Sequence, residues 1–220
     1  MDYFLKFRNH IDFIIDKYGT KNKFFVEAGA NDGVIQSNTY HLEKFSDWTG
    51  ICIEPNYENY LRCLSNRSNS ICFNLALVSE EYEKKTITGL FNSKSLSIAN
   101  GLMSGCTEEH LNEYPDLVCE VSCSTLTECL ENANAPFDFD FLSLDVENYE
   151  LEVLKGLDFT KFRPRIIFLE IGKWHIDEIL QEHFDFLNSK GYEFDSTPNG
   201  WTKQNPIPDS NFCFVDKNII

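Results

Sequence analysis

Apolar residues recur along this chain in two alternating patterns. In residues 3–18 they stand three and four positions apart, which predicts an amphipathic helix ended by Gly19. Short apolar runs typical of buried strands then alternate with helical patterns. Strands are predicted at 23–28, 49–54, 70–78, 86–90, 139–145, 165–170, 192–195 and 211–215. Helices are predicted at 37–45, 57–64, 150–157 and 176–189, with another that Ser124 or Thr125 caps and that runs to about Asn132.

The repeated strand–helix–strand units predict an α/β fold, a mostly parallel sheet with helices on both faces. Because no repeat or linker interrupts residues 1–220, we expect one domain with an N-terminal helix in 1–20. Residues 92–105 are rich in Ser, Asn and Gly. We therefore expect a long loop within 91–110, which is either a lid over the site or an ordinary surface loop.

The charge of the chain narrows its partners. Asp and Glu outnumber Lys and Arg by 35 to 19, which gives a formal net charge of −16. Nucleic acids and anionic membranes would be repelled, and no Lys/Arg-rich run offers a local exception. No apolar run approaches the roughly 18 residues that a membrane span needs, and the N-terminus does not resemble a signal peptide. We expect a cytoplasmic protein whose oligomeric state the sequence leaves open.

The eight cysteines include several inside apolar runs, such as Cys52 and Cys213. This placement is typical of reduced, buried thiols that act as small apolar side chains. Cys119, Cys123 and Cys129 lie close together in the sequence, but no His is spaced to complete a zinc site. We therefore expect no structural zinc.

The first candidate site follows the first predicted strand. Gly29 and Gly33 bracket a turn that leads into a helix, so the backbone could approach a ligand and the helix N-terminus could face an anion. The G-x-G-x-x-G pattern of dinucleotide-binding folds is absent, which disfavours a nicotinamide oxidoreductase. Glu27 and Asp32 would repel a pyrophosphate. They suit a ligand with an ammonium group, a sulfonium and a carboxylate, which S-adenosylmethionine combines.

Other predicted strands also end in acidic residues. Glu54 ends the second strand, where a carboxylate can accept hydrogen bonds from both ribose hydroxyls. Asp145 ends the fourth predicted strand of the sheet, and Glu170 ends the strand expected beside it. Glu147 and Glu150 lead into the next helix, where Glu150 compensates the helix dipole. Asp145 is interpreted as a general base, a metal ligand or a fixed dipole that orients the acceptor.

Several motifs together resemble the FkbM family of methyltransferases, in the expected order over roughly residues 23–170. The motifs are Val26-Glu-Ala-Gly-Ala-Asn-Asp-Gly33, Ser37-Asn-Thr-Tyr-x-Leu-Glu43, Trp48-Thr-Gly-x-x-Ile-Glu54-Pro, Asn66-Arg67, Phe141-Leu-Ser-Leu-Asp145-Val-Glu-x-Tyr-Glu-x-x-Val-Leu-Lys-Gly156 and Arg163-Pro-Arg-Ile-Ile-Phe-Leu-Glu170. The family usually has Gly where this chain has Asn148, but Asn tolerates left-handed geometry and can preserve the turn. The tail after Glu170 matches poorly.

The resemblance implies a class I methyltransferase fold, which is Rossmann-like with a seven-stranded, mostly parallel sheet. It also implies O-methylation, commonly of sugar hydroxyls. The turn residues expected at the cofactor are Glu27, Gly29, Asn31, Asp32 and Gly33. Glu54 would bind the ribose, and Asn74 or Ala76 would lie near the adenine. The expected acceptor is a sugar or glycan, with a deoxysugar such as rhamnose suggested by family precedent alone.

A sugar hydroxyl is a poor nucleophile, so its methylation requires a base or a cation. Asp145, His175 and Glu170 are the candidate catalytic residues, with Asp145 or His175 as the base. Alternatively, Asp145, Glu147 and Glu170 offer oxygen ligands for Mg²⁺ or Mn²⁺. The main alternative to this enzyme is a non-catalytic nucleoside-binding or scaffold member of the same fold, an idea motivated by Asn148. Methylation of a protein or nucleic acid is a further alternative, the latter disfavoured by charge.

Overall fold

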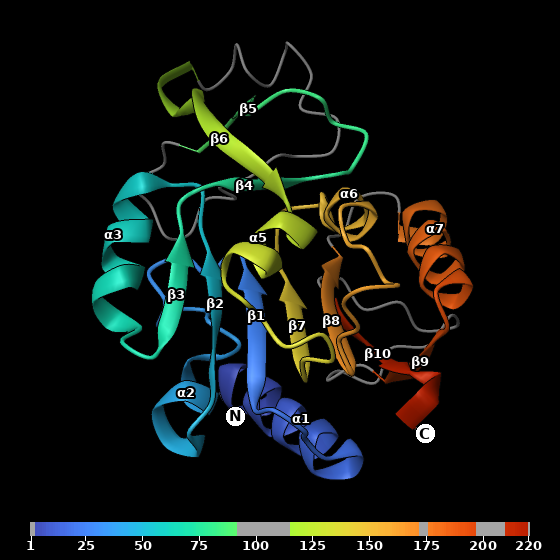
Figure 1. The fold of residues 1–220 in the computed structure, drawn as a ribbon. Helices are drawn as coiled ribbons and strands as arrows, with labels where there is room; N and C mark the ends of the chain where they lie inside the picture. The colour runs from blue at the N-terminus through green and yellow to red at the C-terminus, as the bar shows by residue number, and fades with distance from the viewer. Residues whose placement is uncertain (1–2, 92–114, 172–175, 197–209, 220) are drawn as a thin grey trace.

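The protein is described here by a computed structural model that covers residues 3–91, 115–171, 176–196 and 210–219 (Figure 1). The predicted base His175 and residues 92–110 of the predicted lid lie outside these described residues. No helix in the described part of the chain is both long enough and apolar enough to cross a membrane. The expectation of one domain over 1–220 stays a prediction.

A seven-stranded sheet forms the centre of the fold, in the order β3-β2-β1-β7-β8-β10-β9 (Figure 1). Strands β3 to β8 in this order run parallel, and β10 is antiparallel to both β8 and β9. The strands are β1 (Phe24–Ala28), β2 (Thr49–Ile53), β3 (Ser70–Phe73), β7 (Phe141–Leu144), β8 (Ile166–Ile171), β9 (Tyr192–Ser196) and β10 (Ser210–Asp216). The predicted seven-stranded, mostly parallel sheet is therefore confirmed.

Helices cover both faces of this sheet, as predicted. They are α1 (Tyr3–Tyr18), α2 (Tyr40–Ser46), α3 (Tyr57–Asn66), α5 (Leu126–Asn132), α6 (Glu150–Lys155) and α7 (Ile176–Ser189), with short 3₁₀ helices η1 (Pro115–Leu117) and η2 (Lys217–Ile219). Neighbouring strand residues point to opposite faces, so Phe25 packs with the apolar side chains of α1, α2 and α3. Val26 packs in the core formed with α5, α6 and α7.

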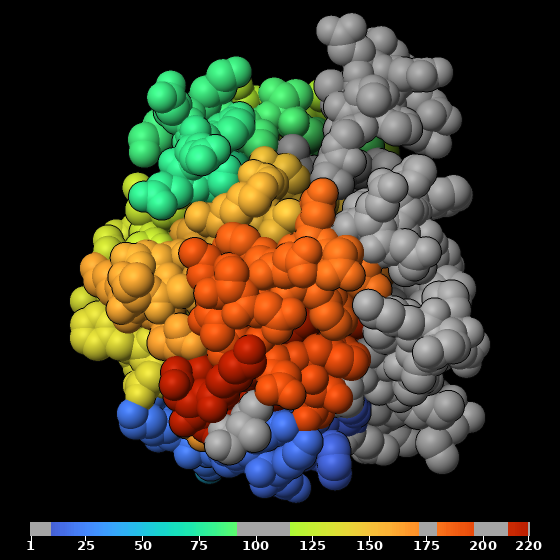
Figure 2. Space-filling model, turned by 90° about the vertical axis from the view of Figure 1, so that its right-hand side faces the viewer, coloured from blue at the N-terminus to red at the C-terminus, as the bar shows by residue number. Residues whose placement is uncertain are grey.

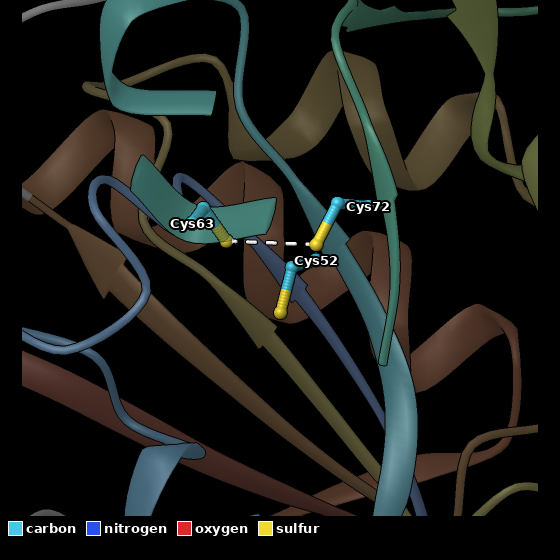
Figure 3. Close-up of side chains that lie close together, drawn as sticks. All are labelled: Cys52, Cys63 and Cys72. Atoms are coloured by element: carbon cyan, nitrogen blue, oxygen red, sulfur yellow. Dashed lines mark hydrogen bonds between the residues drawn. The ribbon is translucent and has the colours of Figure 1, made fainter. Parts of the chain in front are cut away.

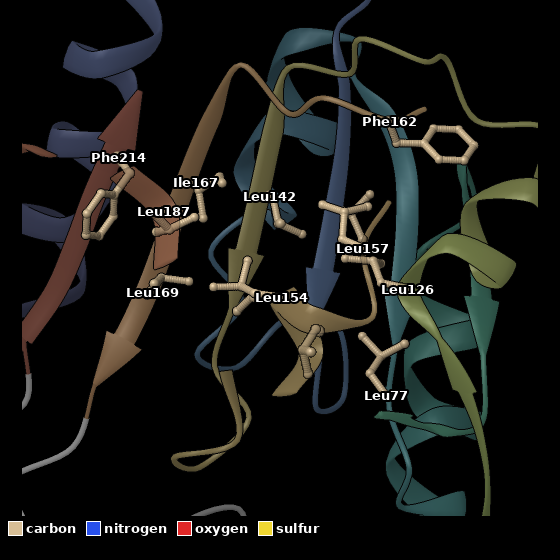
Figure 4. Packing of buried hydrophobic residues seen from close by; sticks show 14 of the residues in the cluster. Leu77, Leu126, Leu142, Leu154, Leu157, Phe162, Ile167, Leu169, Leu187 and Phe214 are labelled. Carbon is tan, nitrogen blue, oxygen red and sulfur yellow. The ribbon is translucent and has the colours of Figure 1, made fainter. Parts of the chain in front are cut away.

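The larger core lies between the sheet and α5, α6 and α7. Leu142 and Ile167 of the sheet meet Leu126 of α5 and Leu154 of α6 there (Figure 4). All four side chains are fully buried. Figure 2 shows α7 and η2 at the molecular surface, viewed from the right-hand side of Figure 1. This packing holds the parallel strands in register, so that their carboxyl ends form one edge.

A second, smaller sheet lies beyond the carboxyl ends of the parallel strands (Figure 1). Its strands are β4 (Ala76–Val78), β5 (Thr86–Gly89) and β6 (Cys119–Thr125), in the order β4-β6-β5. Ala76, Ile87 and Phe91 are buried in its own small core. This sheet covers the edge of the seven-stranded sheet at which the predicted site residues lie.

The predicted secondary structure differs most from the structure at three places. The single strand predicted at 70–78 is wrong, because β3 and β4 belong to different sheets. The chain bends at Asn74, whose side-chain amide donates to the carbonyl oxygens of Glu54 and Pro55. Strand β6 was not predicted, although Cys119, Val121 and Cys123 alternate there with polar residues. The helix predicted at 37–45 begins only at Tyr40.

The predicted cap before α5 is confirmed. Thr125 accepts a hydrogen bond from the Glu128 backbone N–H at 3.1 Å, and the Glu128 carboxylate accepts one from the Thr125 N–H at 3.2 Å. This reciprocal capping box stabilises the first turn of the helix. The helix then runs to Asn132, where the sequence predicts its end.

Candidate cofactor and active site

A pocket opens at the carboxyl ends of β1, β2 and β7, under the small sheet. Its empty space, including the open mouth, is about 410 Å³. The residues that line this crevice pocket are Ala28, Gly29, Ile53, Glu54, Pro55, Leu75, Ala76, Leu77, Phe91, Asp145, Val146 and Tyr149. Because β1 pairs with β2 on one side and β7 on the other, the pocket lies where the strand order reverses.

Glycine is required in the turn after β1 by close contacts within the protein. Gly29 has φ of +79°, and a Cβ there would lie 1.8 Å from the backbone oxygen of Asp145. Gly33 also has φ of +79°, and a Cβ there would lie 2.7 Å from Cγ of Arg67. Gly29 lines the crevice pocket, whereas Gly33 does not. The structure therefore shows a packing role for Gly33, and its predicted approach to a ligand stays a prediction.

Glu27 is held in a buried network of polar side chains. Its Oε1 accepts the Asn38 backbone N–H at 2.5 Å, and its Oε2 accepts the hydroxyls of Ser37 and Thr39 at 2.8 and 2.7 Å. Nη1 of Arg67 donates to the same Oε2 at 3.2 Å. Glu27 is absent from the pocket lining, so its direct contact with the cofactor stays a prediction. Its observed role is to hold the loop that follows the glycine turn.

Arg67 is the central cation of this network and is only 1% exposed. Besides Glu27, it donates to the carboxylate of Glu43 at 2.7 Å and to the carbonyl oxygen of Gly33 at 3.1 Å. Two carboxylates and a carbonyl thus replace the water that a guanidinium would otherwise bind. The Arg67 network, formed by Arg67, Glu27, Glu43, Ser37 and Thr39, ties α3 to the glycine turn. Apart from the Asn66-Arg67 pair in the family resemblance, nothing in the sequence indicates that Arg67 joins α3 to the glycine turn.

The backbone N–H groups of the glycine turn have partners within the protein: those of Gly29 and Ala30 donate to the Ile53 carbonyl oxygen, and that of Gly33 donates to the Ala30 carbonyl oxygen. Asp32 accepts the N–H groups of Val34 and Ile35 at 2.9 and 2.7 Å. The Ser37 hydroxyl accepts the Tyr40 N–H at 3.0 Å, where α2 begins. Helix α2 begins only at Tyr40, so a loop separates it from Gly33, and the predicted approach of its N-terminus to an anion stays a prediction. Asp32 shapes the loop, and its contact with the cofactor stays a prediction.

Glu54 is fixed in the pocket wall by backbone donors. Its Oε2 accepts the Asn31 N–H at 2.9 Å and its Oε1 accepts the Asn56 N–H at 2.8 Å. Burial raises the pKa of this carboxyl to about 7, although the two N–H groups lower it in part. Each oxygen keeps a further lone pair. The carboxylate is therefore oriented to accept two more hydrogen bonds, as a ribose diol would donate.

Apolar side chains border Glu54 on the side of the small sheet. Leu75, Ala76 and Leu77 line the pocket there together with Phe91. Asn74 does not line it, because its amide holds backbone oxygens at the bend before β4. Of the two residues predicted near an adenine, the structure therefore brings Ala76 to the pocket. Nothing in the sequence alone tells which of these neighbours turns inward.

Asn31, whose backbone N–H donates to Glu54, has an unpaired side-chain oxygen within the part of the chain that the structure describes. The side-chain oxygen of Asn31 is buried and has no hydrogen-bond partner among the described residues. Asn31 has φ of +51°, a left-handed conformation that costs free energy in a residue other than glycine. A buried acceptor without a partner is itself unfavourable. A ligand that donates to this oxygen would relieve that cost, so the residues present fit a nucleoside cofactor with an ammonium group.

Four carboxyl groups lie near one another after β7, and Asp145 is the one of them that lines the pocket. Asp145 is hydrogen-bonded to Glu170, and burial together with the charges of Glu170, Glu147 and Glu150 raises its pKa well above the ordinary range. Burial raises the pKa of Glu150 to about 8. Glu150 begins α6, as a dipole-compensating residue would, but it is buried and accepts the Val146 N–H at 3.0 Å. Asp145 and Glu170 thus lie together, as predicted.

The turn after Asp145 retains the geometry for which the sequence suggested glycine. Asn148 has φ of +68° and the preceding Glu147 has φ of +57°. The expectation that Asn148 preserves a left-handed turn is confirmed. Two successive residues other than glycine in this region indicate backbone strain, which is concentrated at functional sites.

The predicted carboxylate metal site is not supported. Within the described part of the chain, the only three potential ligand atoms within 4.8 Å of one another belong to Cys52, Cys63 and Cys72. Asp145, Glu147 and Glu170 therefore do not bring three oxygens together in this way. The carboxyl cluster is arranged as a hydrogen-bonded pair with two further acids nearby.

The comparisons with known proteins agree with this geometry. A sequence profile described as the Methyltransferase FkbM domain matches residues 27–194, most of the chain. The chain belongs to the FkbM methyltransferase family. Every residue that lines the crevice pocket lies within the matched segment. Membership supports methyl transfer from S-adenosylmethionine in general, but it does not identify the acceptor.

The chain is also similar to solved structures of methyltransferases, one of which reaches a TM-score of 0.50. The FkbM methyltransferase of Methylobacillus flagellatus KT superposes with a TM-score of 0.50 and 15% identity, over 90% of this chain and 44% of that one. This FkbM chain thus spans less than half the length of that relative. A TehB-like SAM-dependent methyltransferase from Corynebacterium glutamicum ATCC 13032 Kitasato gives a TM-score of 0.48 and 11% identity, over 98% of this chain and 96% of that one. No curated protein matches the sequence.

One positioning residue of this FkbM chain, Asn56, was not predicted, although the sequence contains the pattern that indicates its role. Asn56 precedes a helical pattern, where Asn commonly caps a helix. It accepts the Asn59 N–H at 3.0 Å as the cap of α3 and donates to the carbonyl oxygen of Phe91 at 2.7 Å. Through its own N–H it also holds Glu54. Asn56 therefore joins the Glu54 carboxylate, helix α3 and Phe91 beside the small sheet.

Proposed function

We propose that this FkbM family member transfers the methyl group of S-adenosylmethionine to a hydroxyl of a sugar or glycan, with Asp145 as the base. The observation that carries the proposal is that Asp145, which is hydrogen-bonded to Glu170, lines the same pocket as Glu54. Glu54 suits a nucleoside, and Asp145 suits removal of a proton.

The pocket offers distinct contacts for each part of the cofactor. Glu54 would accept the two ribose hydroxyls, and Asn31 would accept a hydrogen bond from the ammonium group. Ala76, Leu77 and Phe91 would contact the adenine. When bound, S-adenosylmethionine supplies an electrophilic methyl group on a sulfonium. The task of the protein is to hold the acceptor oxygen in line with that methyl, an entropic gain of up to about 7–11 kcal/mol.

Asp145 is suited to removing the acceptor's proton. A carboxyl with an ordinary pKa is too weak a base for a sugar hydroxyl, whereas burial and the neighbouring acids raise the pKa of Asp145. A hydrogen bond between two carboxyl groups requires that one of them hold a proton, so the pair acts as a base once that proton has left to solvent and Asp145 is ionised. Such base catalysis contributes typically about 10²–10⁴-fold. No carboxylate-held metal ion is part of this proposal.

The acceptor is proposed to be a neutral sugar. Tyr149 lines the pocket and offers aromatic surface to the apolar face of a sugar ring. The net charge of −16 repels nucleic acids and other polyanions. The chain's own acids therefore favour an uncharged, hydroxyl-rich acceptor.

The first experiment is calorimetric titration with S-adenosylmethionine, S-adenosylhomocysteine and NAD. Binding of the first two but not NAD is expected, and binding of NAD alone would contradict the cofactor assignment. Radiolabelled methyl transfer is then measured on neutral sugars including rhamnose, on a protein mixture and on RNA. Label on a sugar alone supports the proposal, and label on protein or RNA alone refutes the acceptor. Cofactor binding without transfer to any of them would favour the non-catalytic alternative.

A further inference from the structure

Three cysteines from three different elements converge beneath the glycine turn. Cys52 lies in β2, Cys63 in α3 and Cys72 in β3, and their Sγ atoms all lie within 4.8 Å of one another (Figure 3). Sγ of Cys63 lies 3.8 Å from Sγ of Cys72. We propose that this three-cysteine cluster binds a single copper(I) ion through three thiolates.

The cluster is placed by regular structure and not by a mobile loop. Cys52 and Cys72 are direct partners in the register of the parallel strands β2 and β3, so their side chains project to the same face of the sheet. Helix α3 packs on that face and places Cys63 between them (Figure 3). Metal sites on helices and strands are held more precisely than those on loops. The three ligands are thus brought together by the fold itself.

The sulfur spacing matches a shared metal ion. With metal–sulfur bonds of about 2.3 Å, ligands in tetrahedral or trigonal geometry are about 3.8–4.0 Å apart. The 3.8 Å between Cys63 and Cys72 lies in this range. Because all three sulfurs already lie within 4.8 Å of one another, shifts of less than about 1 Å complete the set. Side-chain rotation alone can supply such shifts.

The ligand chemistry selects the cation. Thiolates are soft ligands that favour copper(I) and zinc over Mg²⁺, Ca²⁺ or Mn²⁺. Structural zinc is almost always bound by four protein ligands. The described residues place no fourth His, Cys, Asp or Glu atom in the set. Copper(I) is stable with three thiolates in a plane, so it fits the ligands that are present.

The three thiols interact with one another: hydrogen bonds from Cys52 and Cys63 lower the pKa of Cys72, whereas hydrogen bonds within the cluster and burial raise the pKa of Cys52 and Cys63. When a copper(I) ion binds, the three thiols release their protons to solvent and three sulfur–copper bonds form. No electron is transferred, and the net charge of the set becomes −2, which Arg67 partly offsets.

The cluster also has an entry route and a structural neighbour. Cys52 and Cys63 are each 1% exposed, whereas Cys72 is only partly buried. Copper can therefore arrive at Cys72 first. On the inner side, Sγ of Cys63 lies 3.0 Å from the position that a Cβ on Gly33 would occupy. A metal at the cluster would stiffen the contact between α3 and the glycine turn.

The test is anaerobic titration of the reduced, metal-free protein with copper(I) in competition with a chromophoric chelator. One ion per chain is expected, with sulfur-to-copper charge-transfer absorption and a first shell of three sulfurs by X-ray absorption. Cys72→Ser should lower the affinity by more than about 100-fold, since losing a group that only supports a ligand already costs about 10–100-fold. Cys213→Ser is the matched control, because Cys213 is fully buried elsewhere in the sheet.

Other results would overturn the proposal. Failure of the wild-type protein to compete for copper(I), or equal affinity in Cys72→Ser and wild type, would exclude the site. Zinc bound more tightly than copper(I), with a fourth light-atom ligand in the absorption spectrum, would refute the choice of cation. Formation of a Cys63–Cys72 disulfide in air, without copper binding, would identify a redox pair instead. Because Cys72 is partly exposed, folding of its variant can be checked independently by circular dichroism.

Discussion

Glu54 should make cofactor affinity depend on pH close to neutrality. Burial raises the pKa of this carboxyl to about 7 in the free protein. Only the ionised form can accept hydrogen bonds at both oxygens from a ribose diol while keeping those from Asn31 and Asn56. The cofactor therefore selects the ionised form and lowers the pKa of Glu54 when it binds.

The size of the effect follows from the pKa. With a pKa of about 7 in the free protein, Glu54 is about 90% protonated at pH 6 and about 10% protonated at pH 8. If the bound-state pKa lies well below 6, the dissociation constant should be about tenfold higher at pH 6 than at pH 8. Binding near pH 7 should also release about half a proton per cofactor.

Calorimetric titration with S-adenosylhomocysteine across this pH range measures both quantities. In Glu54→Gln the slope should vanish and affinity should fall at all pH values, because the amide NH₂ would face a backbone N–H. Glu58→Gln is the matched control, since Glu58 is exposed on the neighbouring helix α3. Affinity that is equal at pH 6 and pH 8 in the wild-type protein would refute the role of Glu54.

Two further predictions concern stability, and a third concerns cofactor binding. Because burial raises the folded-state pKa of Glu150 from 4.5 to about 8, its ionisation opposes folding, so stability should fall as pH rises from about 5 to 8, at up to about 1.4 kcal/mol per pH unit from this group. Thermal unfolding of Glu150→Gln should lack this part of the slope, and an unchanged slope would contradict it. Arg67→Met should cost about 3–5 kcal/mol in urea unfolding by leaving buried carboxylates uncompensated, whereas the exposed Arg62→Met should cost under about 1 kcal/mol; equal losses would contradict the network. Gly29→Ala should abolish cofactor binding, because its Cβ would lie 1.8 Å from a backbone oxygen, while Gly19→Ala, with similar φ and nothing within 4 Å, should retain binding and lose only about 1 kcal/mol; normal binding by Gly29→Ala would refute the close contact.

Much of the fold could be predicted because the sequence patterns that indicate its strands are local. The apolar runs that form β1, β2, β7 and β8 are bounded by acidic residues, and the carboxyl ends of parallel strands meet at one edge. That rule alone places Glu54, Asp145 and Glu170 around one crevice before any coordinates are known. Asn148 is a further local signal, since its side chain tolerates the left-handed conformation that the structure shows.

The missed features depend on rotation and distance that one sequence does not encode. Glu27 stands in an apolar strand next to the turn, and only the packing of α3 shows that Arg67 meets it. Asn74 is a single polar residue within an otherwise apolar run, and one sequence does not show that the chain leaves the sheet there, so the prediction of one strand over β3 and β4 is wrong. The three-cysteine cluster arises from a strand register and a helix face, whereas sequence spacing drew attention to Cys119, Cys123 and Cys129.

The central claim is that Asp145 serves as the base for methyl transfer to a hydroxyl. Single-turnover transfer of labelled methyl to the best neutral sugar, compared between wild type and Asp145→Asn, tests it most directly, with Asp16→Asn as the exposed control. The account predicts that Asp145→Asn binds S-adenosylhomocysteine normally but transfers methyl about 10²–10⁴-fold more slowly. Transfer at the wild-type rate by Asp145→Asn would contradict it.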